Sequence, residues 1–291
     1  ISGSGPRGRI VERDVKAAIA GGTGKAAPAA APVAAPSAPK APAPQGMSDE
    51  TVKKLFEPGS FTEIPHDNMR KTIARRLTEA KSTIPHFYLS IDCELDALLA
   101  LREQINKAAP QKDGKPAYKV SVNDFIVKAL AVALQRVPDA NATWTDGAML
   151  KHTRSDIGVA VSIPGGLITP VVRNAETKSL SAISNEIKDM AARAKNRKLK
   201  PEEYQGGTSA VSNLGMFGIK NFSAVINPPH ATILAVGAGE KRVVVKGGQP
   251  AVAEMMSVTL STDHRAVDGA LGAELLAAFK QLIENPTGLL V

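Results

Sequence analysis

The spacing of apolar residues predicts alternating helices and short strands over residues 61–291. Apolar positions recur at helical intervals in five segments, which we predict to be helices at 68–81, 95–108, 121–137, 180–199 and 268–282. Alternating or short continuous apolar runs predict strands at 86–95, 142–144, 149–150, 157–163, 167–172, 208–212, 231–236, 243–246 and 256–262. Helices flanking a mixed, largely antiparallel sheet give an α+β fold.

Residues 26–44 break this pattern with a composition that cannot form a core. All but three of these residues are Ala or Pro, and such a segment favours an extended, semi-stiff backbone. We therefore predict a flexible Ala/Pro-rich linker at 23–60, which separates a small segment at 1–22 from a large domain at 61–291.

The segment at 1–22 combines a glycine-rich loop at 3–8 with a short predicted helix at 10–20. The loop fits the pattern G-x-G-x-x-G. A dinucleotide-binding site also requires a strand before that loop, and none is predicted here.

The composition of the chain argues against several classes of function. The net charge is +8, but the basic residues are scattered and aromatic residues make up only 4% of the chain, which does not favour nucleic-acid binding. Cys93 is the only cysteine, so an intrachain disulfide is excluded. No apolar run approaches the roughly 20 residues that span a bilayer. The histidines lack metal-ligand spacing, and we expect no metal site.

The segment DHRAVDG at 263–269 is the strongest candidate for chemistry. It follows an apolar strand and precedes a helix, and such a junction is a rigid place for a functional group. A neutral imidazole accepts a proton near neutral pH, because the reference pKa of histidine is about 6.5. His264 is therefore a candidate general base. A histidine at a strand end is by itself more often a structural residue.

Two further blocks accompany the His-x-x-x-Asp-Gly motif at 264–269. They are GGTSAVSNLGMFG at 206–218 and INPP at 226–229. With these blocks in this order, residues 61–291 resemble the catalytic domains of dihydrolipoyl acyltransferases, the E2 cores of 2-oxo acid dehydrogenase complexes, and more distantly chloramphenicol acetyltransferase. The resemblance implies a chloramphenicol-acetyltransferase-like catalytic domain, in which helices flank a mixed sheet.

The resemblance also implies roles for individual residues. His264 takes the proton from the thiol of coenzyme A, and the sulfur attacks the acyl group carried on dihydrolipoamide. Ser212 donates its hydroxyl to the oxyanion, and Asp268 helps to order the site. Without the resemblance, Ser212 is equally a turn residue and Asp268 is a helix N-cap.

Four other residues are weaker candidates. Phe217 and Phe222 are candidates to line the channel for lipoamide or the pantetheine arm of coenzyme A, although core packing is the simpler role. Arg75 or Arg76 supports the active-site region if the resemblance holds, and otherwise belongs to a solvated helix face.

The resemblance implies partners as well. Residues 1–22 resemble the second half of a peripheral subunit-binding domain, so Arg7 and Arg9 are expected on a basic surface that docks the E1 dehydrogenase or the E3 dihydrolipoamide dehydrogenase. The lipoyl group is expected on a domain absent from this chain. Homotrimers, in which the histidine of one subunit meets the serine of its neighbour, are expected to assemble into a large hollow core through the apolar end at 288–291.

Several alternatives stay open at this point. The blocks at 84–88 and 213–222 resemble the pyruvate dehydrogenase member most, which implies acetyl transfer, but succinyl and branched-chain acyl groups are alternatives. A non-catalytic E2-related scaffold is a second alternative, and a free-standing antibiotic acetyltransferase is a third. We expect a cytoplasmic protein for a bacterial source and a mitochondrial matrix protein for a eukaryotic one. The copy number of the core, 24 or 60, is not set by the sequence.

Overall fold

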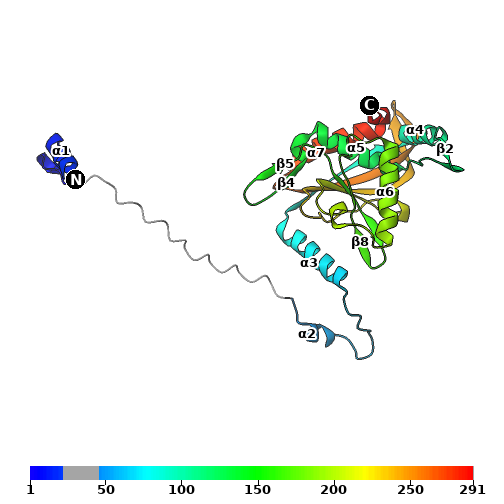
Figure 1. The fold of residues 1–291 in the computed structure, drawn as a ribbon, viewed down its shortest axis with the longest axis horizontal. Coiled ribbons are helices and arrows are strands. Elements are labelled where there is room, and N and C mark those ends of the chain that lie inside the picture. The colour runs from blue at the N-terminus through cyan, green and yellow to red at the C-terminus, as the bar shows by residue number, and fades with distance from the viewer. Residues whose placement is uncertain (22–45, 291) are drawn as a thin grey trace. The chain divides into compact units, whose positions relative to one another are not determined.

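The chain divides into two compact units in a computed structural model that describes residues 1–21 and 46–290. The first unit, Ile1–Ile64, contains the 3-10 helix η1 (Pro6–Gly8) and the helices α1 (Glu12–Ala20) and α2 (Asp49–Lys53) (Figure 1). The Asp14 carboxylate accepts hydrogen bonds from the backbone N–H of Ser4 (2.8 Å) and of Val11 (3.0 Å), which ties the glycine-rich loop to α1.

The predicted linker at 23–60 lies partly outside the described residues. Its described part contains α2, which the composition did not predict. Ser48 begins this helix, because its hydroxyl accepts a hydrogen bond from the Thr51 N–H (3.3 Å).

The second unit, Pro65–Val291, is built on one six-stranded mixed sheet. The strand order is β1 (His86–Glu94), β12 (Gln249–Asp263), β11 (Thr232–Lys246), β10 (Ser209–Asn213), β6 (Ile157–Val159) and β9 (Val171–Val172). β10 pairs in parallel with both β11 and β6, and the other neighbours are antiparallel. The predicted α+β class with a mixed sheet is confirmed.

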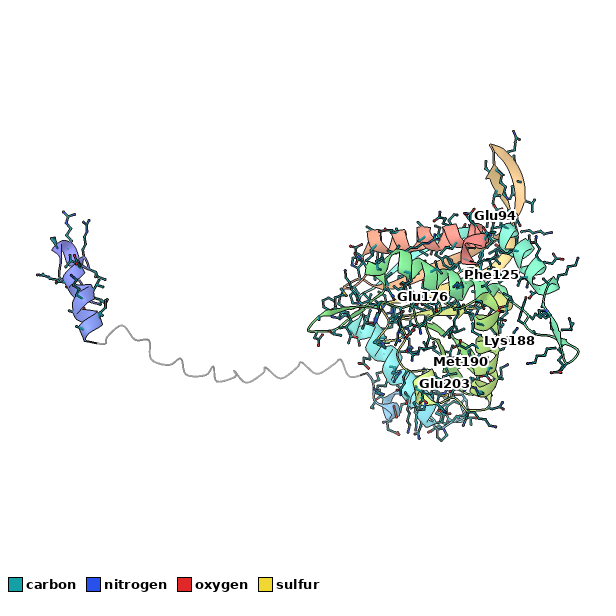
Figure 2. All side chains as sticks on the ribbon, turned by 45° about the horizontal axis from the view of Figure 1, so that its top comes forward. Glu94, Phe125, Glu176, Lys188, Met190 and Glu203 are labelled. Atoms are coloured by element: carbon teal, nitrogen blue, oxygen red, sulfur yellow. The ribbon has the colours of Figure 1, made fainter. Side chains whose placement is uncertain are left out.

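The five predicted helices of this unit are present. They are α3 (Asn68–Thr83), α4 (Asp96–Lys107), α5 (Val122–Arg136), α6 (Leu180–Lys195) and α7 (Gly269–Glu284). The predicted N-cap Ser121 accepts a hydrogen bond from Asp124 N–H (3.4 Å) at the start of α5. α5 and α7 pack side by side (Figure 2). The core contains fully buried Phe125 and Phe279, one from each helix.

The segments at 231–246 and 256–262 differ from the prediction of three separate strands. β11 and β12 form one long hairpin that closes through Gly247 and Gly248, and its tip projects from the body of the unit (Figure 2). The register shifts between Val236 and Gly239. A side chain at Gly237 is impossible, because its Cβ would lie 1.9 Å from the Lys220 carbonyl oxygen. The small residues that appeared to end a strand are a bulge inside it.

The predicted strand pair at 157–172 is also more divided than expected. β6 and β9 join the main sheet, whereas β7 (Val161–Ile163) and β8 (Gly166–Ile168) form a separate ribbon. The predicted hairpin of β4 (Ala142–Trp144) and β5 (Met149–Lys151) is present. The remaining short elements are β2 (Gln111–Lys112), β3 (Lys115–Pro116), η2 (Pro138–Ala140), η3 (Pro201–Glu203), η4 (Gly215–Phe217) and η5 (Pro286–Leu289).

Candidate active site

His264 lies in the turn between the last residue of β12 and the first residue of α7. Its backbone N–H donates to the carbonyl oxygen of Pro85 (3.0 Å), and the N–H of Asp263 donates to the carbonyl oxygen of Ala231 (2.8 Å). These bonds anchor the turn to the residues that directly precede β1 and β11. The side chain of His264 is exposed, and its ring meets the ring of Phe87 edge to face, with centroids 5.0 Å apart. The imidazole is thus held on a fixed backbone and is open to a reactant.

The two charged residues that flank His264 are paired with each other. The Asp263 carboxylate is buried and accepts hydrogen bonds from Arg265 Nε (2.9 Å) and Nη2 (2.8 Å). The hydrogen bond to Asp263 raises the pKa of the Arg265 guanidinium. The same guanidinium lies over the Trp144 ring at 5.3 Å, which connects the β4–β5 hairpin to the turn. Asp263 is therefore a structural acid.

Asp268 caps α7. Its Oδ1 accepts a hydrogen bond from the Leu271 N–H (2.9 Å), and a carboxylate at a helix N-terminus is favoured by the helix dipole. This cap fixes where α7 begins relative to His264, four residues earlier. The predicted ordering role is compatible with this position.

Ser212 lies in a different part of the unit, near the end of β10. It lines an apolar cavity of about 600 Å³ that also includes Asn213 and Phe217. The other lining residues come from α4 and its N-cap Leu95, from α5 and α6, from strands β6, β7, β8, β10, β11 and β12, and from η4, and they are mostly aliphatic. Phe222 is half-buried and lies outside the lining set. Of the two predicted channel residues, the cavity includes Phe217 only.

Asn213 and Asn123 are polar members of this cavity that the sequence analysis did not select. The Asn213 side chain donates to Asn123 Oδ1 (3.1 Å) and accepts from the Gly215 N–H (2.9 Å). These bonds fix the turn after Ser212 to the first turn of α5. Asn213 follows Ser212 directly in the quoted block, whereas Asn123 is 90 residues away in sequence and only the fold reveals it.

Ser212 and His264 do not meet within one chain. Ser212 pairs with Ala235 on β11, which pairs with Thr259 on β12. His264 lies five residues beyond Thr259. With strands about 4.8 Å apart and a rise of about 3.3 Å per residue, the two positions are on the order of 20 Å apart. One chain therefore presents two separate candidate half-sites, one at His264 and one at Ser212.

The other histidines have structural environments. His86 Nε2 accepts from the Ile226 N–H (3.1 Å), so its proton is on Nδ1, which donates to the Ile84 carbonyl (2.9 Å). Burial lowers the pKa of His230, whose Nε2 bonds the Gly206 carbonyl (2.9 Å). Burial also lowers the pKa of His152. His66 is exposed.

The remaining predicted residues and groups are placed as follows. Arg75 and Arg76 are exposed on α3, and Arg7 and Arg9 are exposed in the first unit. Cys93 is buried, and burial raises its pKa to about 12, so it is a poor nucleophile. Within residues 1–21 and 46–290 there is no cluster of three or more His, Cys, Asp or Glu side chains that fits a metal ion, and no helix suited to crossing a membrane.

Comparison with known proteins finds close relatives along the whole chain. It is 69% identical to the dihydrolipoyllysine-residue acetyltransferase component of the pyruvate dehydrogenase complex of Rhizobium meliloti over 291 residues, which are 100% of this chain and 64% of that protein. It is 45% identical to the mitochondrial counterpart of Caenorhabditis elegans, of which it covers 53%. The chain thus spans less than two thirds of the length of these relatives.

Solved structures agree with these relatives. A probable dihydrolipoamide acetyltransferase from Listeria monocytogenes has a TM-score of 0.73 and 33% identity, covering 78% of this chain and 95% of that one. The dihydrolipoamide acetyltransferase of Azotobacter vinelandii has a TM-score of 0.77 and 27% identity, covering 86% and 100%. Residues 58–291 match the family described as 2-oxoacid dehydrogenases acyltransferase (catalytic domain). The resemblance in the motifs is confirmed, and the chain belongs to this family of acyltransferases.

Proposed function

We propose that this chain transfers an acetyl group from S-acetyl-dihydrolipoamide to coenzyme A and that its assembled copies form the core of a pyruvate dehydrogenase complex. One observation carries the proposal. A crystallographic and enzymatic study of the Azotobacter vinelandii protein addressed a serine, a histidine and an asparagine in its catalytic mechanism. The serine and histidine of that protein are 52 positions apart and the asparagine is four further on, the same spacing as Ser212, His264 and Asp268.

The chemistry follows from the two half-sites. An imidazole nitrogen of His264 takes the proton of the coenzyme A thiol, and the thiolate attacks the thioester carbonyl carbon. The Ser212 hydroxyl donates a hydrogen bond to the oxyanion of the tetrahedral intermediate. The intermediate collapses by breaking the bond to the dihydrolipoamide sulfur, which takes the proton back from His264. Acetyl-coenzyme A and dihydrolipoamide leave.

Asp268 replaces the asparagine of the Azotobacter vinelandii protein at this spacing. We assign it a positioning role, because its carboxylate is engaged in capping α7 and thereby holds the turn that contains His264. Proton transfer stays with His264 in this proposal.

Two copies are needed to complete the site. Because the half-sites of one chain are on the order of 20 Å apart, His264 of one copy must face Ser212 of another. We propose a homotrimer, in which each interface carries one complete site. The cavity at Ser212 suits the aliphatic arm of lipoamide or of pantetheine, and Phe217 is 66% exposed at its border, where a neighbouring copy or a substrate arm can cover it.

The partners and the division of the chain remain part of the proposal. We assign residues 1–22 to a partial docking domain for E1 and E3, with Arg7 and Arg9 on its basic surface, residues 23–60 to a linker, and residues 61–291 to the catalytic domain. For larger assembly through 288–291, Leu290 is the exposed apolar residue within the described part of this segment, because Leu289 is buried in its own chain, and Val291 lies outside the described residues. The bacterial relatives support a cytoplasmic location.

An acetyl-transfer assay tests the proposal. The purified chain is mixed with S-acetyl-dihydrolipoamide and coenzyme A, and acetyl-coenzyme A is measured by mass spectrometry. The succinyl and branched-chain analogues are run in parallel to test acyl choice. Acetyl-coenzyme A formation that His264→Ala abolishes at unchanged assembled size supports the proposal. A silent wild type of the correct size favours the scaffold alternative, and an unchanged variant removes His264 as base.

A further inference from the structure

The ring that contacts His264 comes from a strand that the chemistry above does not use. Phe87 on β1 pairs with Thr262 on β12, and His264 lies two residues beyond Thr262. His264 is in the turn just after β12, and the contact between the two rings makes Phe87 and His264 diagonal neighbours. Their ring planes are 89° apart at a centroid distance of 5.0 Å, which is the edge-to-face arrangement that aromatic rings prefer.

The helix that follows His264 is shaped around the same strand. A Cβ added to Gly269 would lie 3.3 Å from Phe87 Cε1 and 3.5 Å from Phe87 Cζ, and one added to Gly272 would lie 2.6 Å from Leu89 Cδ1. The two glycines are one turn apart on α7, and they meet alternate residues of β1. The backbone of Gly269 is outside the left-handed region, so its conformation does not require glycine. What the missing side chain provides is space for the Phe87 ring.

No hydrogen bond holds the His264 ring in the described part of the chain, where only its backbone N–H is bonded. The edge-to-face contact with the Phe87 ring restricts how the imidazole turns. A base must be held in a narrow range of positions, since a displacement of about 1 Å can cost on the order of a hundredfold in rate.

We propose that Phe87 is a positioning residue for the base His264, and that the missing side chain of Gly269 leaves the space in which the Phe87 ring lies between α7 and the imidazole. This inference rests on the proposed acetyl transfer. It assigns a reason to the glycine of the His-x-x-x-Asp-Gly motif: a larger residue there pushes the ring against the base.

The test is a double-mutant cycle in the assembled full chain with Phe87→Leu, Gly269→Ala and the double variant. We expect Phe87→Leu to lower kcat at least about tenfold with KM for both substrates within about twofold, because the loss concerns the orientation of the base. Gly269→Ala is expected to lower kcat about threefold to tenfold without lowering the melting temperature. In the Phe87→Leu background the added methyl group displaces no ring, so the double variant should match Phe87→Leu alone.

Phe61→Leu is the matched control, because Phe61 is exposed to a similar extent (42% against 37% for Phe87) and its ring packs edge to face on Phe56. Its kcat should equal that of the wild type. An unchanged kcat in Phe87→Leu, a change in KM alone, or additive losses in the double variant would overturn the positioning role. If Phe87→Leu fails to assemble, Gly269→Ala decides alone, and an unchanged kcat there refutes the proposal. An inactive wild type would instead contradict the proposed function itself.

Discussion

The two half-sites of this chain are built in opposite ways. His264 stands exposed on a short turn whose backbone is hydrogen-bonded to the residues that directly precede two strands, and its flanking acid is buried and paired with Arg265. Ser212 lies at the border of an apolar cavity whose walls come from at least seven elements. A base needs solvent access and a fixed orientation, whereas an oxyanion donor works best where water is excluded. In the proposed mechanism, separating them in one chain lets each environment be shaped independently, and assembly of the copies brings them together.

The largest expected effect is on the exposed half-site. His264→Ala should lower the rate of acetyl transfer about a thousandfold, because general base catalysis typically contributes between a hundredfold and ten-thousandfold. The assembled size and the melting temperature should not change, since the imidazole is exposed and makes no hydrogen bond within the described residues. Stopped-flow or mass-spectrometric rates measure the first, and size-exclusion chromatography and calorimetry measure the others. A loss of assembly would show that the half-site is structural.

In the cavity half-site the expected loss is smaller. Ser212→Ala should lower kcat about a hundredfold, which is the effect of removing one oxyanion donor, and should leave KM nearly unchanged. Ser212→Thr keeps the hydroxyl and should retain part of the rate if the cavity tolerates a methyl group. An alanine variant with wild-type kcat would leave the cavity as a binding surface without a role in the transition state.

Joining the half-sites across an interface makes a prediction about mixtures. When His264→Ala and Ser212→Ala chains are refolded together at equal amounts, an interface has both intact groups in about a quarter of the random pairings. Activity should therefore rise from the residual level of either variant to about a quarter of the wild-type rate. Mixing without refolding is the control and should give no gain. No recovery after verified subunit mixing contradicts a shared site.

The sequence predicts the exposed half-site better than the cavity for a physical reason. His264 follows an alternating strand and precedes an amphipathic helix, so a local pattern places it correctly. The cavity depends on contacts such as the bond between Asn213 and Asn123, which are 90 residues apart. Local spacing contains no information on that distance. The family blocks located Ser212, but its surroundings had to come from the fold.

Errors in the strands have the same origin. Residues 237–239 are small, and small residues in a strand are read as a break when the tertiary contact is unknown. Here they form a bulge, because the Lys220 carbonyl passes directly beside Gly237. The contact of Arg265 with Trp144 was likewise invisible, since it joins the turn after β12 to a hairpin more than a hundred residues earlier.

A weaker effect, on stability, is expected from substituting Asp263, the acid that directly precedes His264. Asp263→Asn should lower the free energy of unfolding of the catalytic unit by about 1–2 kcal/mol, because it removes the charge that pairs with Arg265. The effect is moderate because the Arg265 side chain is 33% exposed, so water screens the pair. The melting temperature measures this. Asp139→Asn is the control, since its ion pair with Lys151 is exposed on both sides and should contribute almost nothing. Equal melting temperatures for both variants would mean that Asp263 does not brace the turn.

The smallest expected effect is on the pH dependence of stability, and it concerns His230, a buried histidine at the same end of the strands as the exposed His264. His230 precedes β11, and burial lowers its pKa, so the folded chain keeps it neutral. Below the unfolded pKa of about 6.5, the unfolded chain binds more protons than the folded one. The free energy of unfolding therefore decreases as the pH is lowered, by at most about 1.4 kcal/mol per pH unit for this group. His230→Gln should therefore reduce the drop in melting temperature between pH 7.5 and pH 5.5. An equal drop in both proteins would place the acid sensitivity elsewhere, and the half-buried His152, whose pKa burial also lowers, is the next residue to substitute. Acetyl transfer at pH 7.5 should be unchanged, because Nε2 of His230 is engaged with the Gly206 carbonyl and takes no part in the proposed proton transfer, which distinguishes this structural histidine from His264.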